Sequence, residues 1–383
     1  VRDNIHSYDL VSAFWQYHQA PKPAAVYNVG GGRGNSLSIL ETFDMVNRIS
    51  GKTWNNYKYV DEARSGDHIW YISDLSQLKA DYPKWSITYP VERIVRDIVC
   101  SQSSGMVTSI LQGGIGNQLF LVALAYAASK RTNRRLMFLK NQFSGCRQGS
   151  HPSTYYNNFL SKLPFTEDDT KFRNMSVVRE RSLLSYDVMP EVMANESICF
   201  SGYFQSDEYF KDYLQEIREL FTPNGGIVEY LKRNSEVFAR FPELLTFDED
   251  RVFMGIRRGD FITHAHHHNP CGMTYYRKAM ALMGNTRQYY ILTDDFEWAK
   301  RNFEGSQYHF LEIEGDTHQL MTSSLFKNYI ISNSTFYWWG SFLSVYNDIR
   351  CIAPDKWTNG FPKDYRGCYR SEMEVIERPV ETD

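Results

Sequence analysis

The sequence has no apolar run long enough to cross a membrane and no excess of charge of one sign. Its longest clearly apolar run, residues 119–128, is far shorter than the roughly 20 residues that span a bilayer. Lysine and arginine number 42 and aspartate and glutamate 45, so the net charge is −3. Proteins that bind a nucleic-acid backbone carry an excess of basic side chains. The composition therefore predicts neither a transmembrane helix nor a nucleic-acid partner.

Paired cysteines and a leader segment are also missing. The 6 cysteines are spread along the chain without a C-x-x-C pair, so neither a disulfide framework nor a zinc site is indicated. The chain begins at Val1 without a charged-then-apolar leader. These features predict a cytoplasmic location, and the inner face of a membrane is one place within it that they allow. They leave open the oligomeric state and whether the native chain extends before Val1.

The composition and length predict a folded chain of more than one domain. Hydrophobic residues make up 42% of 383 residues, which is ample for a full-sized core. A short polar stretch, residues 101–105, separates two segments in which the strand and helix pattern starts afresh. We therefore predict a segment over residues 1–100, a linker over 101–105 and a second segment over 106–383. The second segment divides near residue 245 into an acceptor-side half, 106–245, and a donor-binding half, 246–383.

The first segment lacks an intact phosphate-binding glycine motif. Residues 26–29 have the pattern of a short strand, and residues 36–49 that of a helix. The glycines between them fail the G-x-G-x-x-G spacing, because Leu37 stands where the third glycine would be. The glycine stretch therefore favours a tight strand-to-helix turn. Apolar spacing also predicts a helix over residues 91–99.

Three stretches of this segment, residues 1–10, 27–32 and 62–67, resemble the carboxy-terminal half of sugar-nucleotide epimerases of the extended short-chain dehydrogenase/reductase family, with CDP-tyvelose 2-epimerase as the nearest type. The resemblance implies a small α/β substrate-domain fragment with a vestigial nucleotide-sugar site formed by Arg2, Arg64 and Asp67. The NAD-binding half of that family does not precede residue 1, so we expect no NAD cofactor and no epimerase activity from this chain alone.

The second segment begins with the pattern of a parallel βα unit. Residues 107–111 read as a buried strand, 112–116 as a glycine turn, 117–130 as a helix capped by Asn117, and 135–139 as a further strand. A Tyr-x-x-x-Lys pair within this helix, Tyr126 and Lys130, is interpreted as chance. The pattern indicates an α/β fold without specifying a function.

Polar clusters follow three more predicted strands, and these clusters carry the functional argument. The strands 252–256, 289–292 and 328–331 run into Arg257-Arg258-Gly259-Asp260, Thr293-Asp294-Asp295 and Ser332-Asn333-Ser334-Thr335. Open parallel sheets bind ligands at the carboxyl ends of their strands. Adjacent arginines and hydroxyls at a helix start suit a pyrophosphate, and acids suit sugar or ribose hydroxyls. A nucleotide-sugar donor would use all three kinds of group.

Several of these groups also have structural interpretations. Asp294 and Asp295 could simply begin the helix 296–303, since acids stabilise a helix amino terminus. The D-x-D spacing at 248–250 favours a solvated loop over a metal site. The histidines at positions 264 and 266–268 lack a helical ligand spacing and favour a mobile loop. Trp338 and Trp339 are interpreted as half core and half sugar platform.

Six motifs in order resemble the α1,2-fucosyltransferase family over nearly all of residues 106–383. They are residues 113–120, 202–206, 257–261, 275–276, 293–295 and 332–340. The resemblance implies a GT-B architecture of two Rossmann-like domains. It also implies metal-independent, inverting transfer of L-fucose from GDP-fucose to the 2-hydroxyl of a terminal galactoside.

Carried over to this sequence, the resemblance gives each motif residue a role. Arg257 would neutralise the departing diphosphate, and Asp260 would act either as the base or as a residue that orders the arginines. Donor binding would involve Arg258, Asp294, Asp295, Ser334 and Thr335. Asn117, Gln118, Gln205 and Trp338 would line the cleft on the acceptor side.

One position departs from the family pattern. The arginine motif usually reads His-x-Arg-Arg-x-Asp, and Gly255 stands here in place of the histidine. Donor affinity or donor choice could change with it. The alternatives to fucosyl transfer are therefore a non-catalytic protein that binds glycans or nucleotides, and a fragment of a bifunctional epimerase and fucosyltransferase.

Overall fold

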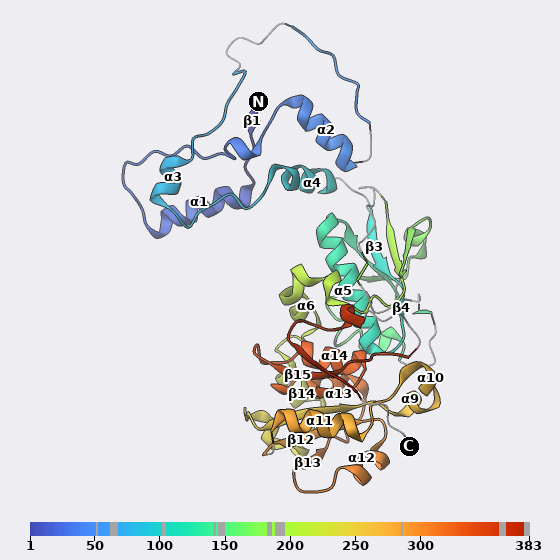
Figure 1. Ribbon diagram of the computed structural model, residues 1–383. Helices are drawn as coiled ribbons and strands as arrows, with labels where there is room; N and C mark the ends of the chain where they lie inside the picture. Colours follow the sequence, from blue (N-terminus) through green and yellow to red (C-terminus); the bar gives the residue numbers. More distant parts are fainter. Residues whose placement is uncertain are drawn as a thin grey trace. The chain divides into compact units, whose positions relative to one another are not determined.

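The computed structural model describes residues 1–50, 53–61, 68–101, 105–140, 143–144, 150–181, 186–187, 196–284, 286–359 and 365–378 (Figure 1). The chain forms two compact units. Unit 1 consists of Val1–Met106 with Ser129–Arg135 and Glu191–Ser197, and unit 2 consists of Val107–Ala128, Leu136–Pro190 and Ile198–Asp383. Each unit is described by itself.

Unit 1 is built mainly from helices. Its elements are β1 (Arg2–Asp3), α1 (Ser7–Gln19), the 3-10 helix η1 (Arg33–Asn35), β2 (Ser36–Leu37), α2 (Ile39–Ser50), α3 (Ser76–Asp81) and α4 (Val91–Ser101). Strands β1 and β2 pair antiparallel. The helix predicted over residues 91–99 is confirmed as α4, and α2 confirms most of the helix predicted over residues 36–49.

The core of unit 1 is small and is organised around helix α1. Ala13 packs with four buried side chains from the second half of the unit: Leu75, Leu78, Tyr82 and Trp85. The buried Asp9 carboxylate accepts hydrogen bonds from the backbone N–H groups of Thr88 and Tyr89 at 3.1 and 3.0 Å. The prediction of a strand over residues 26–29 is wrong, because these residues have no strand partner within the described residues; Tyr27 and Val29 instead pack against the core.

Unit 2 contains a sheet of four strands in the order β5-β3-β10-β9. The strands are β3 (Met106–Ser109), β5 (Arg135–Leu136), β9 (Ser176–Arg179) and β10 (Ile198–Ser201), and β10 pairs parallel with both β3 and β9. The strands predicted over 107–111 and 135–139 are each split in two. Their second halves, β4 (Leu111–Gln112) and β6 (Phe138–Leu139), pair with β7 (Phe143–Ser144) and β8 (Phe165–Thr166).

The second sheet of unit 2 has six parallel strands in the order β13-β12-β11-β14-β15-β16. They are β11 (Arg251–Ile256), β12 (Gln288–Thr293), β13 (Tyr308–Phe310), β14 (Asn328–Ile331), β15 (Arg350–Pro354) and β16 (Met373–Ile376). In chain order this is the 3-2-1-4-5-6 arrangement of a doubly wound sheet. The strands predicted over 252–256, 289–292 and 328–331 are confirmed as β11, β12 and β14.

Helices cover both faces of the six-stranded sheet (Figure 1). On one face, Met254 and Ile256 pack against α11 (Met273–Met283) and α12 (Phe296–Asn302). On the other face, Phe253 contacts Tyr337 of α14 (Thr335–Phe342), at a centroid distance of 5.8 Å. Helix α13 (Asp316–Ser323) packs against α14.

The remaining helices of unit 2 are short, apart from α5 (Ile115–Thr132). They are α6 (Leu214–Phe221), α7 (Ile227–Asn234), α8 (Val237–Arg240), α9 (Gly259–Thr263) and α10 (Ala265–His268), with 3-10 turns η2 (Pro152–Tyr155), η3 (Asp169–Phe172), η4 (Asp207–Tyr209), η5 (Lys211–Tyr213), η6 (Pro242–Leu245) and η7 (Tyr365–Cys368). Helix α5 confirms the helix predicted over 117–130 but begins two residues earlier.

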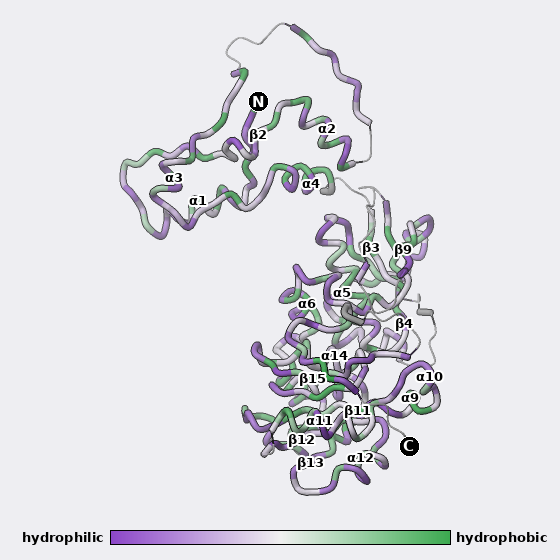
Figure 2. The backbone as a smooth tube through the Cα atoms, viewed as in Figure 1, coloured by the Kyte–Doolittle hydropathy of each residue, from purple (hydrophilic) through white to green (hydrophobic). Residues whose placement is uncertain are grey.

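Hydropathy follows burial along the chain of unit 2 (Figure 2). The central strands β11 and β14 are almost entirely buried, as expected for parallel strands covered on both faces. Within the described residues, no helix combines the length and apolar character that crossing a bilayer requires. The cysteines at 199, 271, 351 and 368 are buried.

Candidate functional site

The candidate site lies where the connections of the six-stranded sheet change direction. Strands β11 and β14 are neighbours at the centre of the sheet. The chain after β11 leads to β12 on one side of this pair, and the chain after β14 leads to β15 on the opposite side. Because β11 and β14 are parallel, their carboxyl ends lie side by side. Arg257 follows β11, and Ser332, Ser334 and Thr335 follow β14. Doubly wound sheets bind ligands at this position.

A cavity of ≈ 340 Å³ opens at this point. Residues from five segments of unit 2 form its wall, namely the start of α5, the loop after β10, the segment from the end of β11 to α10, the start of α14, and the loop after β15. The lining residues are Gly114, Ile115, Gly116, Asn117, Tyr203, Gln205, Arg257, Asp260, Phe261, His267, His268, Asn333, Ser334, Thr335, Phe336, Trp357 and Thr358.

Two helix amino termini meet at the cavity. Helix α5 begins at Ile115 and α14 at Thr335, and residues of both first turns line the wall. A methyl group on Gly116 would lie 2.6 Å from the backbone carbon of Thr335, so only glycine allows this close approach. The first N–H groups of a helix have no acceptor within it and attract anions. Ser334, which precedes α14, makes no capping hydrogen bond with its side chain.

Asn117 joins three segments at the cavity wall. Its Oδ1 atom accepts hydrogen bonds from Gln205 Nε2 at 2.8 Å and from Thr335 Oγ1 at 3.0 Å. The prediction that Asn117 caps its helix is wrong, because α5 already begins at Ile115. Asn117 and Gln205 do line the cavity, where the sequence placed them.

Replacing Asn117 with alanine should lower the free energy of unfolding by about 1–2 kcal/mol, because two hydrogen bonds lose their acceptor. The loss should be accompanied by weaker GDP binding, since Thr335 begins the helix at the cavity. Urea unfolding and calorimetric titration with GDP would measure the two effects. Asn234→Ala is the matched control, because the exposed Asn234 side chain donates to the carbonyl of Tyr230 one turn earlier in its own helix. Equal effects of the two substitutions would contradict the joining role of Asn117.

Arg257 provides positive charge at the cavity and is held by two carboxylates. Its Nη2 lies 2.8 Å from Asp260 Oδ1, and its Nη1 lies 3.1 Å from Asp294 Oδ2. The Asp260 carboxylate makes no well-aligned hydrogen bond within the described residues, so this ion pair is its main interaction. A methyl group on Gly259 would lie 2.7 Å from Asp294 Oδ2, which explains the glycine between the arginines and Asp260.

Arg258 does not reach the cavity. Arg258 instead stacks on Trp298 of α12, with its guanidinium carbon 4.0 Å from the ring centroid. Its Nε lies 3.4 Å from Asp295, which also caps α12 by accepting a hydrogen bond from the N–H of Trp298. Asp294 accepts a 2.7 Å hydrogen bond from the N–H of Arg258. Arg258, Asp294 and Asp295 hold the arginine loop and are not among the described residues that line the cavity, and their predicted contacts with the donor stay predictions. Ser334 and Thr335 do line it.

Tyr337 occupies the space beside Gly255. A Cβ atom on Gly255 would lie 2.5–2.7 Å from three carbons of the Tyr337 ring, so no side chain fits there while the ring is in place. The phenol donates to the carbonyls of Ile256 and Leu292 at 3.1 and 3.0 Å. Burial raises the pKa of the Tyr337 phenol, so it stays a donor at neutral pH. The position of the missing histidine is thus a packing contact with α14.

The acceptor-side predictions for Gln118 and Trp338 are wrong. Gln118 is fully buried and donates from Nε2 to the carbonyls of Gly113 and Ser150, both at 2.9 Å. The Trp338 side chain is 1% exposed and packs against Phe120, with a centroid distance of 4.6 Å. Trp339 is fully buried as well. Both tryptophans are therefore core residues.

The histidine segment forms part of the cavity wall. His264 directly precedes the short helix α10, which contains the other three histidines, so the predicted loop is wrong for these residues. Asn359 donates to the carbonyls of His267 and Ala265 at 2.7 and 3.0 Å and holds this helix in place. Within the described residues, no group of three or more His, Cys, Asp or Glu side chains is arranged to hold a metal ion. The residues at 248–250 are an exposed loop, as predicted.

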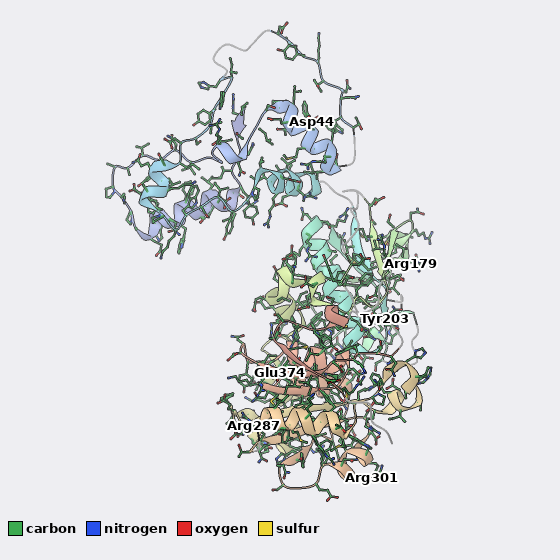
Figure 3. All side chains as sticks on the ribbon, in the orientation of Figure 1. Asp44, Arg179, Tyr203, Arg287, Arg301 and Glu374 are labelled. Atoms are coloured by element: carbon green, nitrogen blue, oxygen red, sulfur yellow. The ribbon has the colours of Figure 1, made fainter. Side chains whose placement is uncertain are left out.

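The sequence did not single out several aromatic lining residues, among them Tyr203, Phe336 and Trp357. Tyr203, labelled in Figure 3, belongs to the motif at 202–206. Glu180 holds this motif by accepting hydrogen bonds from the N–H groups of Tyr203 and Phe204 at 2.7 and 2.9 Å, and burial raises the pKa of Glu180. Trp357 follows β15 and carries no local pattern that would have revealed it.

The predicted nucleotide-sugar site of unit 1 is described only in part. Arg2 donates from Nη1 to the carbonyls of Val1 and His68, at 2.9 and 2.6 Å. Arg64 and Asp67 lie outside the described residues. The epimerase resemblance of residues 1–99 therefore stays a prediction.

Comparison with known proteins identifies the class of the chain. Residues 157–377 match the family described as Glycosyl transferase family 11. The chain belongs to this family, which confirms the glycosyltransferase class predicted from the motifs. The matched region includes the whole six-stranded sheet and its cavity residues from Tyr203 onward.

Two relatives and one solved structure show what the chain is similar to. It is 24% identical to the O-antigen biosynthesis glycosyltransferase WbnK of Escherichia coli, over 66% of this chain and 95% of that protein. It is 28% identical to an alpha-1,2-colitosyltransferase of Escherichia coli, over 66% of this chain and 92% of that protein. The crystal structure of the fucosyltransferase NodZ from Bradyrhizobium is similar at 15% identity with a TM-score of 0.37, covering 63% of this chain and 94% of that one.

Proposed function

We propose that this protein transfers L-fucose from GDP-fucose to the 2-hydroxyl of a terminal galactoside, with inversion at the sugar carbon and without a metal ion. The observation that carries the proposal is the cavity at the junction of β11 and β14. There, one arginine and two helix amino termini present positive charge around a space large enough for a sugar diphosphate. The four-stranded sheet and the six-stranded parallel sheet of unit 2 fit the GT-B architecture that the motifs predict.

The chemistry follows from the placement of charge. As the bond between the sugar carbon and the diphosphate breaks, negative charge grows on the departing phosphate oxygens. Arg257 and the first N–H groups of α14 and α5 stabilise that charge, because they are fixed in position before the reaction. Two carboxylates hold the Arg257 guanidinium and thus limit its movement. The acceptor hydroxyl attacks the opposite face of the sugar, with its proton taken by a base.

Colitosyl transfer is the second candidate function. The relative at 28% identity is an alpha-1,2-colitosyltransferase, so it shares the linkage that we propose while its donor sugar differs. Colitose is L-fucose without the 3-hydroxyl. The two donors therefore differ by a single polar group, which can be discriminated by one hydrogen bond.

The proposal predicts GDP release that depends on both a fucosyl donor and a β-galactoside acceptor and that continues in EDTA. We would measure GDP release from GDP-fucose and from GDP-colitose, each with and without galactosides, with EDTA or with added Mg²⁺ or Mn²⁺. Faster release from GDP-colitose would favour the second candidate. Donor binding without release with any acceptor would support the binding-protein alternative and contradict enzymatic transfer, and loss of turnover in EDTA would contradict the metal-independent mechanism.

A further inference from the structure

Asp260 is poorly placed to take the proton of the acceptor hydroxyl. Its carboxylate is the ion-pair partner of Arg257 at 2.8 Å, and Arg257 is the group assigned to the leaving diphosphate. In an inverting displacement, the base acts on the face of the sugar opposite the leaving group. A residue bound to the arginine on the diphosphate side serves instead to orient that arginine. The base must then come from another part of the cavity wall.

His268 lines the same cavity, and its ring is available for a ligand. The ring stacks on Phe261, with a centroid distance of 4.2 Å and an interplanar angle of 8°. The side chain is half-buried, and within the described residues neither ring nitrogen takes part in a hydrogen bond. The stacking fixes the plane of the imidazole and leaves its two nitrogens able to hydrogen-bond with a ligand.

The backbone of His268 is fixed at the cavity wall by a hydrogen bond from Asn333. Asn333, in the segment that follows β14, donates from Nδ2 to the His268 carbonyl at 2.5 Å and to the Trp357 carbonyl at 2.7 Å. Asn333 also lines the cavity and is 2% exposed. Asn333 therefore fixes the position of His268 relative to the segment after β14 and to Trp357.

The electrostatic surroundings keep His268 neutral. Burial lowers its pKa, and the charges of His267, His264 and Arg257 act in the same direction. The carboxylate of Asp260 acts in the opposite direction without reversing the shift. A histidine with a lowered pKa is unprotonated at neutral pH and can accept a proton.

We propose that His268 is the general base of the transfer reaction, an inference that rests on the proposed function. As the acceptor oxygen bonds to the sugar carbon, its proton passes to a ring nitrogen of His268. The bond from that carbon to the phosphate oxygen breaks, and its electron pair leaves with GDP. The imidazolium then releases the proton to solvent, so the net products are the glycosylated acceptor, GDP and one proton.

The test compares the full-length wild type with His268→Gln across pH 5.5–9, with His266→Gln as the control. His266 is on the same short helix but does not line the cavity. We expect kcat to fall about 100-fold in His268→Gln, with GDP affinity unchanged. The wild type and the control should lose activity as the pH falls through the pKa of His268, and this acid limb should be absent from His268→Gln.

A second variant separates a chemical role from a structural one. His268→Ala should regain activity when imidazole is added, because free imidazole can occupy the vacated space and accept the proton. Retention of the acid limb in His268→Gln, activity within about threefold of wild type, or loss of GDP binding in both variants would overturn the assignment. Absence of acceptor-dependent GDP release from the wild type itself would instead count against the proposed function.

Discussion

Arg257→Ala should lower kcat/KM for sugar transfer by about 1,000-fold, because electrostatic stabilisation of the leaving group is commonly the largest single contribution to such a reaction. Arg257 is the one lysine or arginine among the described residues that line the cavity. No neighbouring side chain of that charge can therefore replace it. The measurement is steady-state GDP release with a saturating acceptor, together with the affinity for GDP.

The substitution also removes the cation between two carboxylates, so its effect on folding must be measured separately. Arg257→Lys keeps the charge but loses the fork that reaches both Asp260 and Asp294. We expect it to unfold at a urea midpoint close to wild type while losing about 10- to 100-fold in kcat/KM.

Arg350→Ala is the control for loss of an arginine. Arg350 is at the amino end of β15, away from the carboxyl ends where the cavity lies, and forms an exposed 3.0 Å pair with Glu374, labelled in Figure 3. Its removal should leave kcat/KM unchanged. If Arg257→Ala retained activity within about tenfold of wild type while remaining folded, the leaving-group role would be wrong.

Much of the donor-side site could be predicted because its signals are local. Buried strands followed at once by polar residues occur in the sequence as short runs, and the structure contains β11, β12 and β14 at those positions. Parallel pairing then brings the ends of β11 and β14 together. Local sequence patterns were sufficient to predict a site residue wherever its position directly after a strand placed its side chain at the cavity.

The errors arose where a distant element decides which way a side chain faces. Arg257 and Arg258 are neighbours in the sequence, but the Arg258 side chain stacks on Trp298 of α12. Trp338 lies two residues after Phe336, which lines the cavity, but its neighbour in space is Phe120 of α5. The same holds for His268, which Asn333 attaches to the cavity wall across a gap of 65 residues. Such contacts are tertiary and have no signature in a single sequence.

Gly255 and Tyr337 form a coupled pair, and changing one alone should be costly. A Cβ at position 255 would overlap the Tyr337 ring, and β11 is hydrogen-bonded to strands on both sides, so the backbone cannot move away. We expect Gly255→Ala to lower the free energy of unfolding by about 3 kcal/mol, the upper end of the usual cost of overpacking. Gly255→His, which restores the family motif, should be worse still.

The double substitution Gly255→His/Tyr337→Ser should recover much of this stability. Removing the ring empties the space that the histidine needs, so the two changes nearly conserve volume. Tyr337→Ser alone should cost about 3–5 kcal/mol, because it leaves a cavity and removes the donor to the carbonyls of Ile256 and Leu292. Tyr337→Phe keeps the ring and isolates the contribution of the phenol.

Urea unfolding of the four proteins, wild type, both single variants and the double variant, gives the coupling energy between the two positions. We expect the double variant to be more stable than the sum of the single effects by at least about 2 kcal/mol, in line with residues in direct contact. Because Ile256 directly precedes Arg257, a folded double variant should also show whether the histidine changes the KM for the donor. Additive effects would show that the two positions do not compete for the same space, and Gly255 would then have to be explained by donor recognition alone.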